Sequence, residues 1–187
     1  SPFALVASPT PPAKDLKEFI AFAKSRSGKL SFGTIGAGQV PWWAVFLFNH
    51  MAGVNAVDIT YKGTSEAMTD VMTGRLDYFV APLVGALAAK DKLRVLAVTS
   101  AERSAMLPDV PSMAEAGLPG YDMPAWRSIM GPAGMPPEVV AILNKAIQQA
   151  LASPDLRDRY AKAGSVPLGS TPGELRKRYE YWMGIFE

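Results

Sequence analysis

The sequence predicts an α/β fold with one complete, parallel-rich α/β lobe over residues 3–130, followed by helices over residues 131–187. Short apolar runs rich in β-branched residues alternate with segments of helical periodicity from residue 3 to residue 99, which is the pattern of successive βαβ units. The connections are too long for hairpins, so helices should cover both faces of a parallel sheet. From residue 136 onward the periodicity is almost purely helical, and no further strand is predicted there.

The first elements of the lobe have clear boundary signals. Phe3–Ala7 is a short apolar run that ends at a Ser-Pro-Thr-Pro-Pro turn, so it predicts a strand. An amphipathic helix begins near Leu16 and stops before Gly28. The buried strand Leu30–Thr34 follows. Pro41 fits the first turn of the next helix, where its missing N–H costs no hydrogen bond.

The same kinds of signal predict the rest of the lobe. The helix that contains Pro41 should end near Ala52, before Gly53. We expect the later elements in this order: strand Ala56–Tyr61, helix Thr64–Thr73, strand Leu76–Val80, helix Leu83–Lys90, strand Leu93–Thr99, a short helix at Ser112–Ala116 and a strand at Trp126–Met130.

Helices are predicted throughout the C-terminal part. The last of them is the best marked, because Thr171 and Glu174 form a capping box with a proline at the first helical position. A second helix occupies Pro154–Ala163. The helix before it has an apolar stripe that needs a partner to cover it. The stripe consists of Val139, Val140, Leu143, Ala146, Ile147, Ala150 and Leu151.

Composition excludes several classes of function. With 49% hydrophobic residues the chain can bury a sizeable core. Its net charge is +2 and its 19 Lys and Arg residues are spread along the chain, so we expect no nucleic-acid partner. There is no cysteine, and His50 is the one histidine, which excludes thiolate catalysis and multi-histidine metal sites. No apolar run reaches the ~20 residues of a membrane span.

The stretch FGTIGAGQVPWW, residues 32–43, joins a predicted strand to a predicted helix. It does not complete a dinucleotide-binding fingerprint, because Pro41 stands where a small residue is needed, and it lacks the lysine of a P-loop. A glycine-rich loop before a helix can instead turn backbone N–H groups outward and bind an anion. Thr34 and Gln39 would add side-chain hydrogen bonds. The alternative, a tight turn whose glycines serve only close packing, is equally open.

Two further strand ends should lie at the same edge of the sheet. Tyr61-Lys62-Gly63 leads into a helix with a cation and hydroxyl groups, although Lys62 fits a solvated surface position equally well. The uncharged end Val80-Ala81-Pro82 would form a third wall. No pattern favours catalysis: Asp58, Asp70 and Asp77 stand where solvated acids are ordinary.

Read in order, these segments resemble the substrate-binding proteins of tripartite tricarboxylate transporters, also called the Bug receptor family. The resemblance covers nearly the whole chain. It is carried by PAKDLKEFIAFAKSRSGKLSFGTIGAGQ, VDITYKGTSEAMTDVMTGRLD, KLRVLAVTSAERSAMLPDVPSMAEAGLPGYD and GPAGMPPEVVAILNKAIQQALASPDLRDRYAKAG. The order of the Leu-Pro-Asp-Val-Pro and Ala-Glu-Ala-Gly-Leu-Pro-Gly segments is its most specific part.

The resemblance implies a type II periplasmic binding protein fold, in which two α/β lobes close on a small organic acid and present it to membrane transporter subunits. It implies no reaction and no cofactor, and a periplasmic location. Residues 3–130 would be the second lobe of the family, and residues 131–187 the C-terminal helical part of the first. The ligand-binding residues we expect are Thr34, Gly36, Ala37, Gly38, Gln39, Tyr61, Lys62, Ala81 and Trp126.

Three features depart from the family pattern. The family has a further segment before Phe3, so we expect a fragment whose half cleft binds ligand poorly and whose uncovered C-terminal helices drive self-association. Trp42 stands where the family commonly has histidine. It would make the cleft larger and more apolar, or alternatively it would pack in the core. Ala81 replaces Asp or Asn, and if it faces the cleft the ligand should be a partly apolar or aromatic acid. Trp126 would offer a stacking face or serve in the core.

Other functions remain as alternatives at this point. The same lobe could serve a sensor or interaction scaffold that takes no part in transport. An enzyme with an α/β nucleotide-binding fold is a further alternative, which the failed fingerprints disfavour.

Overall fold

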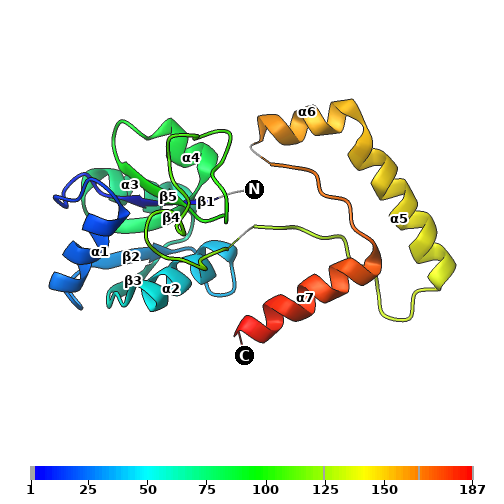
Figure 1. Cartoon of the computed structure of the whole chain (residues 1–187), viewed down its shortest axis with the longest axis horizontal. Coiled ribbons are helices and arrows are strands. Elements are labelled where there is room, and N and C mark those ends of the chain that lie inside the picture. Colours follow the sequence, from blue (N-terminus) through cyan, green and yellow to red (C-terminus); the bar gives the residue numbers. More distant parts are fainter. Residues whose placement is uncertain (1–2, 124, 164, 187) are drawn as a thin grey trace. The chain divides into compact units, whose positions relative to one another are not determined.

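The structure is a computed structural model that describes residues 3–123, 125–163 and 165–186 (Figure 1). The chain divides into two compact units, Ser1–Ala125 and Trp126–Glu187, and each is described by itself. The first unit contains the sheet, and the second is helical.

The sheet of the first unit is mixed. Its strands are β1 (Phe3–Ala7), β2 (Ser31–Thr34), β3 (Val57–Thr60), β4 (Tyr78–Pro82) and β5 (Arg94–Val98), in the order β3-β2-β4-β1-β5. β2 pairs in parallel with β3 and β4, whereas β1 pairs antiparallel with both β4 and β5. The α/β class is confirmed, but the expectation that all strands are parallel is wrong for β1. A strand covered on both faces is apolar whichever way it runs, so its composition does not reveal its direction.

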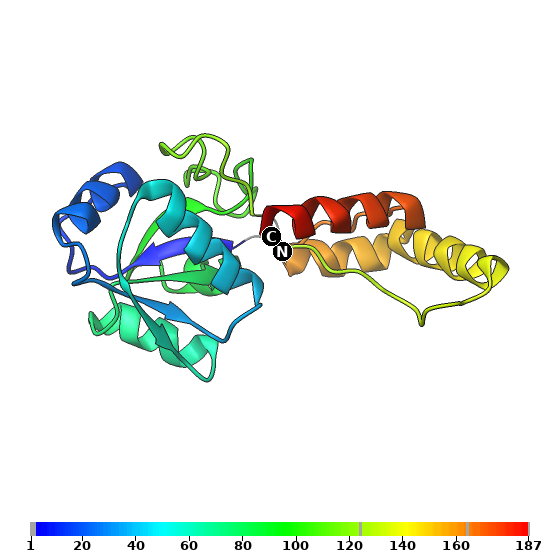
Figure 2. The ribbon, with the colours of Figure 1, turned by 90° about the horizontal axis from the view of Figure 1, so that it is seen from below.

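Helices cover both faces of this sheet. They are α1 (Leu16–Ser25), α2 (Val40–Ala52), α3 (Thr64–Thr73) and α4 (Leu83–Ala88). Figure 2 shows α1 and α2 on one side of the sheet and α3 on the other. α2 has Pro41 in its first turn and ends at Gly53, whose φ of 62° is left-handed, so both predicted boundary signals of this helix are confirmed.

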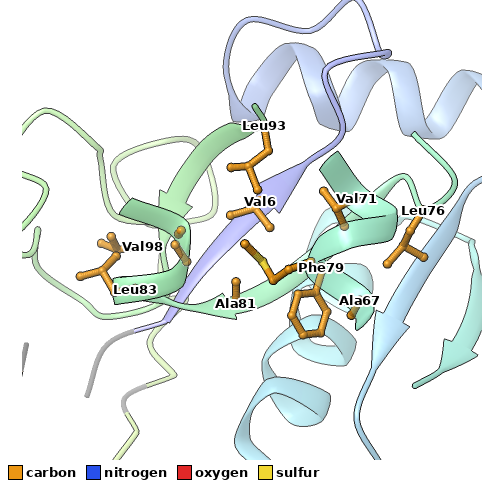
Figure 3. Close-up of a cluster of buried hydrophobic side chains, with 12 residues drawn as sticks. Val6, Ala67, Val71, Leu76, Phe79, Ala81, Leu83, Leu93 and Val98 are labelled. Carbon is orange, nitrogen blue, oxygen red and sulfur yellow. The ribbon is translucent and has the colours of Figure 1, made fainter. Parts of the chain in front are cut away.

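The core has one layer on each side of the sheet. Figure 3 shows the layer beneath α3 and α4, a cluster of buried side chains that includes Val6 of β1, Phe79 of β4, Val71 of α3 and Leu83 of α4. On the other side the ring of Tyr78 lies at the centre, with its centroid 5.4 Å from that of Phe19, 5.7 Å from that of Phe32 and 5.9 Å from that of Phe48. These contacts fix α1 and α2 over β2 and β4.

The segment after β5 departs from two predictions. Residues 113–117 form turns in place of the expected short helix, after an isolated bridge between Ser112 and Val98. Ser112 and Glu115 nevertheless exchange the two hydrogen bonds of a capping box, at 2.8 and 3.2 Å. The turns end at Gly117, whose φ of 117° no helix can contain. Trp126–Met130 is not a strand: no described strand pairs with it, and the Ile129 side chain is 73% exposed.

The second unit consists of α5 (Pro137–Ala152), α6 (Pro154–Lys162) and α7 (Pro172–Phe186), close to the predicted positions. The capping box before α7 is confirmed, since the Thr171 N–H donates to Glu174 Oε2 over 2.7 Å and the Glu174 N–H donates to Thr171 Oγ1 over 3.2 Å. No described residue of α5 or α6 is buried, and Leu143 of the apolar stripe is 47% exposed.

In the described ranges, no helix is both long and apolar enough to cross a membrane.

Candidate functional site

The glycine loop of residues 35–39 connects the end of β2 to the start of α2, and its glycines differ in what they do. Gly36 has a φ of 110° and Gly38 a φ of 81°, values that favour glycine. A Cβ added at either position would meet no atom within 4 Å, so their requirement lies in the backbone and not in packing. Gly33 is the opposite case, since a Cβ there would lie 2.8 Å from Leu76 Cδ2 and 3.0 Å from Phe79 Cδ2.

Most backbone N–H groups of the glycine loop have no partner in the part of the chain that the structure describes. Those of residues 35–38 donate to no main-chain oxygen and to no side chain, whereas Ala37 and Gly38 lie in a turn that brings the Gln39 N–H toward the Gly36 carbonyl. Gln39 precedes α2 as its N-cap residue, and its side chain makes no capping hydrogen bond. The loop therefore presents amide donors together with the positive end of the helix dipole, which is the chemistry that binds a small anion.

Thr34 has a different role from the one expected. Its side chain is 1% exposed, and its hydroxyl donates to Asp58 Oδ1 of β3 over 2.8 Å, with Thr60 Oγ1 at 3.3 Å. This hydroxyl is engaged in joining β2 to β3, so it is not available as a direct ligand group in this structure. Asp58 and Thr60 are polar groups of this edge that sequence reasoning did not assign to the site.

Tyr61 is likewise engaged within the lobe. Its hydroxyl donates to Asp70 Oδ2 of α3 over 2.9 Å, and its N–H donates to the Thr34 carbonyl over 2.8 Å. Arg75 Nη1 lies 3.3 Å from the other carboxylate oxygen of Asp70. Burial, followed by the hydrogen bond to Asp70, raises the pKa of Tyr61 to about 12. Lys62, the next residue, has an exposed side chain that remains a candidate for contact with an anion.

Of the two other expected site residues, only Ala81 can be placed relative to the glycine loop. Ala81 is fully buried in the core layer beneath α3 and α4, so its side chain does not face a cleft at the sheet edge (Figure 3). A buried position in this layer favours a small apolar residue, so the presence of alanine at position 81 says nothing about the ligand. Trp126 is the first residue of the second unit, and its part in a ligand site stays a prediction.

An aromatic cluster adjoins the glycine loop in the first turns of α2. The ring centroids of Trp42 and Phe46 lie 4.3 Å apart, those of Trp42 and Trp43 4.6 Å apart, and those of Phe32 and Phe46 5.5 Å apart. Phe46 is 37% exposed, and Trp42 and Trp43 are half-buried. The two tryptophans therefore pack only partly into the core. The spacing of Trp42 and Phe46 by one helical turn was the signal for this cluster.

Residues 1–176 match the sequence model of a protein family described as the tripartite tricarboxylate transporter family receptor. The chain is also 31% identical over 190 residues to Protein BugT of Bordetella pertussis, which covers 98% of this chain and 58% of BugT.

Solved structures give the same result. The R. palustris protein Rpa4515, solved with adipate, is 28% identical with a TM-score of 0.85, and the match covers 99% of this chain and 62% of that one. MatC from Rhodopseudomonas palustris, solved with bound malate, is 33% identical with a TM-score of 0.75, over 89% of this chain and 57% of that one. The chain spans about half the length of the curated relatives it matches, between 49% and 58% for three of them.

Proposed function

The chain belongs to the tripartite tricarboxylate transporter receptor family, and on this basis we propose that it captures a small organic carboxylate outside the cytoplasm for a tripartite tricarboxylate-type transporter. The members of this family are solute-binding receptors and not enzymes. Two relatives were solved with dicarboxylates, adipate and malate, which supports a carboxylate as the ligand.

The observation that carries the proposal is the set of unpaired amides in the glycine loop, at the start of α2. A carboxylate accepts charge-assisted hydrogen bonds from N–H groups, and these are roughly twice as strong as bonds between neutral groups. Together with the helix dipole they can hold one carboxylate without an arginine. We assign this role to Gly36, Ala37, Gly38 and Gln39, with Lys62 as the nearby cation.

We further propose that residues 3–130 form one ligand-binding lobe and that the helices of residues 131–187 complete the other. The absence of buried residues in α5 and α6, among those described, supports this assignment, because such helices need an apolar surface to pack on. Relatives about twice as long leave room for a second lobe. Where that lobe is absent, the exposed stripe around Leu143 would drive self-association.

The location and the partners follow from the same family. Relatives solved as a periplasmic transporter and as periplasmic binding protein BugD support a periplasmic location. The partners would then be the small organic acid and the membrane subunits of the transporter.

Thermal unfolding of the full-length protein with a panel of carboxylic acids tests the proposal. An acid present at a hundred times its dissociation constant should raise the free energy of unfolding by about 2.7 kcal/mol. A neutral amide analogue of the same acid, used as the control, should leave the unfolding temperature unchanged. If no acid in the panel stabilises the protein, the proposal fails.

A further inference from the structure

We infer that the ligand is an acid with an aromatic ring, and that Trp42 selects it. This inference rests on the proposed function, because it concerns the part of the ligand that extends from the carboxylate held by the glycine loop. It depends on the position of Trp42 relative to that loop, on the exposure of the aromatic cluster and on the charge beside it.

Ring contacts place Trp42 at the level of the loop entrance. β2 runs toward the loop and α2 runs away from it, and the two are in register where Phe32 meets Phe46, with centroids 5.5 Å apart. From this level Thr34 lies two strand residues nearer the loop, about 6.6 Å. Trp42 lies one helical turn nearer the loop, about 6 Å. By ideal strand and helix geometry, Trp42 and Thr34 are therefore at about the same height along β2, near the start of the loop.

Side-chain direction strengthens this placement. In an α-helix the Cα–Cβ bond tilts toward the N-terminus, so the indole of Trp42 leans toward the loop and not away from it. Phe46 supports the indole from below at a centroid distance of 4.3 Å, and Trp43 contacts its edge at 4.6 Å. The indole is thus held in place before a ligand arrives, which lowers the entropy cost of stacking against it.

The charge on the same face opposes a second carboxylate. Asp58 lies on β3 and points to the α2 side of the sheet, where it accepts the hydrogen bond of Thr34. A second carboxylate that extended from the loop toward the indole would also approach Asp58, whereas one that extended toward Lys62 would not, so the charge disfavours a dicarboxylate only along the Trp42 side. A ring in that position contacts an apolar surface and meets no like charge.

Calorimetric titration of the full-length protein with benzoate, adipate and malate tests the inference. We expect benzoate to bind at least about tenfold more tightly than malate. Trp42→Leu keeps apolar bulk but removes the ring, so it should weaken benzoate about tenfold and change malate less than about twofold. Trp42→Phe keeps an aromatic ring at this position, so it should retain the preference for benzoate over malate. Phe22→Ala removes a half-buried aromatic ring near the end of α1, beyond the far end of β2, and should leave all affinities unchanged.

The outcomes separate the inference from the proposed function. If adipate or malate binds as tightly as benzoate, or if Trp42→Leu weakens all three acids equally or none, the selection by Trp42 is wrong while carboxylate binding stands. If no carboxylic acid in a wider panel binds, the proposed function fails, and the inference fails with it.

Discussion

The hydroxyl of Tyr61 donates a hydrogen bond of 2.9 Å to the carboxylate of Asp70, and this bond ties the end of β3 to α3. The N–H of the same tyrosine holds the carbonyl of Thr34, the last residue before the glycine loop. Tyr61 therefore uses both of its hydrogen-bond donors inside the lobe, and its role is to support the base of the loop.

Replacing Tyr61 with phenylalanine should lower stability and leave affinity nearly unchanged. The hydroxyl is lost while the ring and the N–H remain, so the free energy of unfolding should fall by about 1 kcal/mol. Urea denaturation measures the first quantity, and calorimetric titration with a bound acid measures the second. A large loss of affinity at unchanged stability would instead place the Tyr61 hydroxyl on the ligand.

The same substitution should change the alkaline limb of the stability curve. A tyrosine in the unfolded chain titrates near pH ~10, whereas folded Tyr61 has a pKa of about 12 and keeps its proton longer. Between these values the unfolded state holds fewer protons, so the free energy of unfolding falls as pH rises.

In Tyr61→Phe this fall should be shallower. Burial also raises the pKa values of Tyr78 and Tyr121, but both residues are present in both proteins, so the difference reports Tyr61. Denaturation at intervals from pH ~9 to ~12 provides the comparison. Parallel curves for the two proteins would contradict the raised pKa.

Gly36→Val should abolish binding while the fold persists. A branched side chain disfavours the left-handed φ of 110°, and relieving that strain would rotate the loop amides away from the ligand. We expect affinity to fall by more than about tenfold with an unchanged far-ultraviolet circular dichroism spectrum. Gly85→Ala in α4 is the matched control, because its Cβ also meets nothing within 4 Å and its φ is not positive. Equal affinity in both variants would show that the glycine loop is only a tight turn and does not bind the acid.

Gly33→Ala should lower the stability of the fold and leave the affinity for the acid unchanged. The added methyl group would lie 2.8 Å from Leu76 Cδ2 and 3.0 Å from Phe79 Cδ2, so overpacking should cost about 1–3 kcal/mol of unfolding free energy. Chemical denaturation checks this loss. The folded fraction should still bind the acid with normal affinity, and a protein as stable as the parent would show that the strand has no close packing here.

Most element positions in this chain follow from local signals. The capping box of Thr171 and Glu174 and the left-handed Gly53 at the end of α2 depend on hydrogen bonds between near neighbours, so they can be predicted without tertiary structure. For the glycine loop, the succession of strand, glycines and helix left outward amides and a tight packing turn equally open, and the empty space around Gly36 and Gly38 speaks against the packing role.

What could not be predicted depends on distant partners. The antiparallel direction of β1 is set by its pairing with β4 and β5, and a strand apolar on both faces gives no local sign of it. The inward direction of Ala81 could not be predicted for a similar reason. The residues of β4 are apolar on both faces, so no alternation shows which way each side chain points. The hydroxyl of Thr34 is taken by Asp58, whose approach requires the parallel pairing of β2 with β3.

The most direct test of the account is nuclear magnetic resonance of the backbone amides during titration with a bound acid. If the loop amides hold the carboxylate, the proton resonances of Gly36, Ala37 and Gly38 should move downfield in proportion to occupancy, and those of the buried sheet should not. Saturation with ligand while these three resonances stay in place would contradict the central claim.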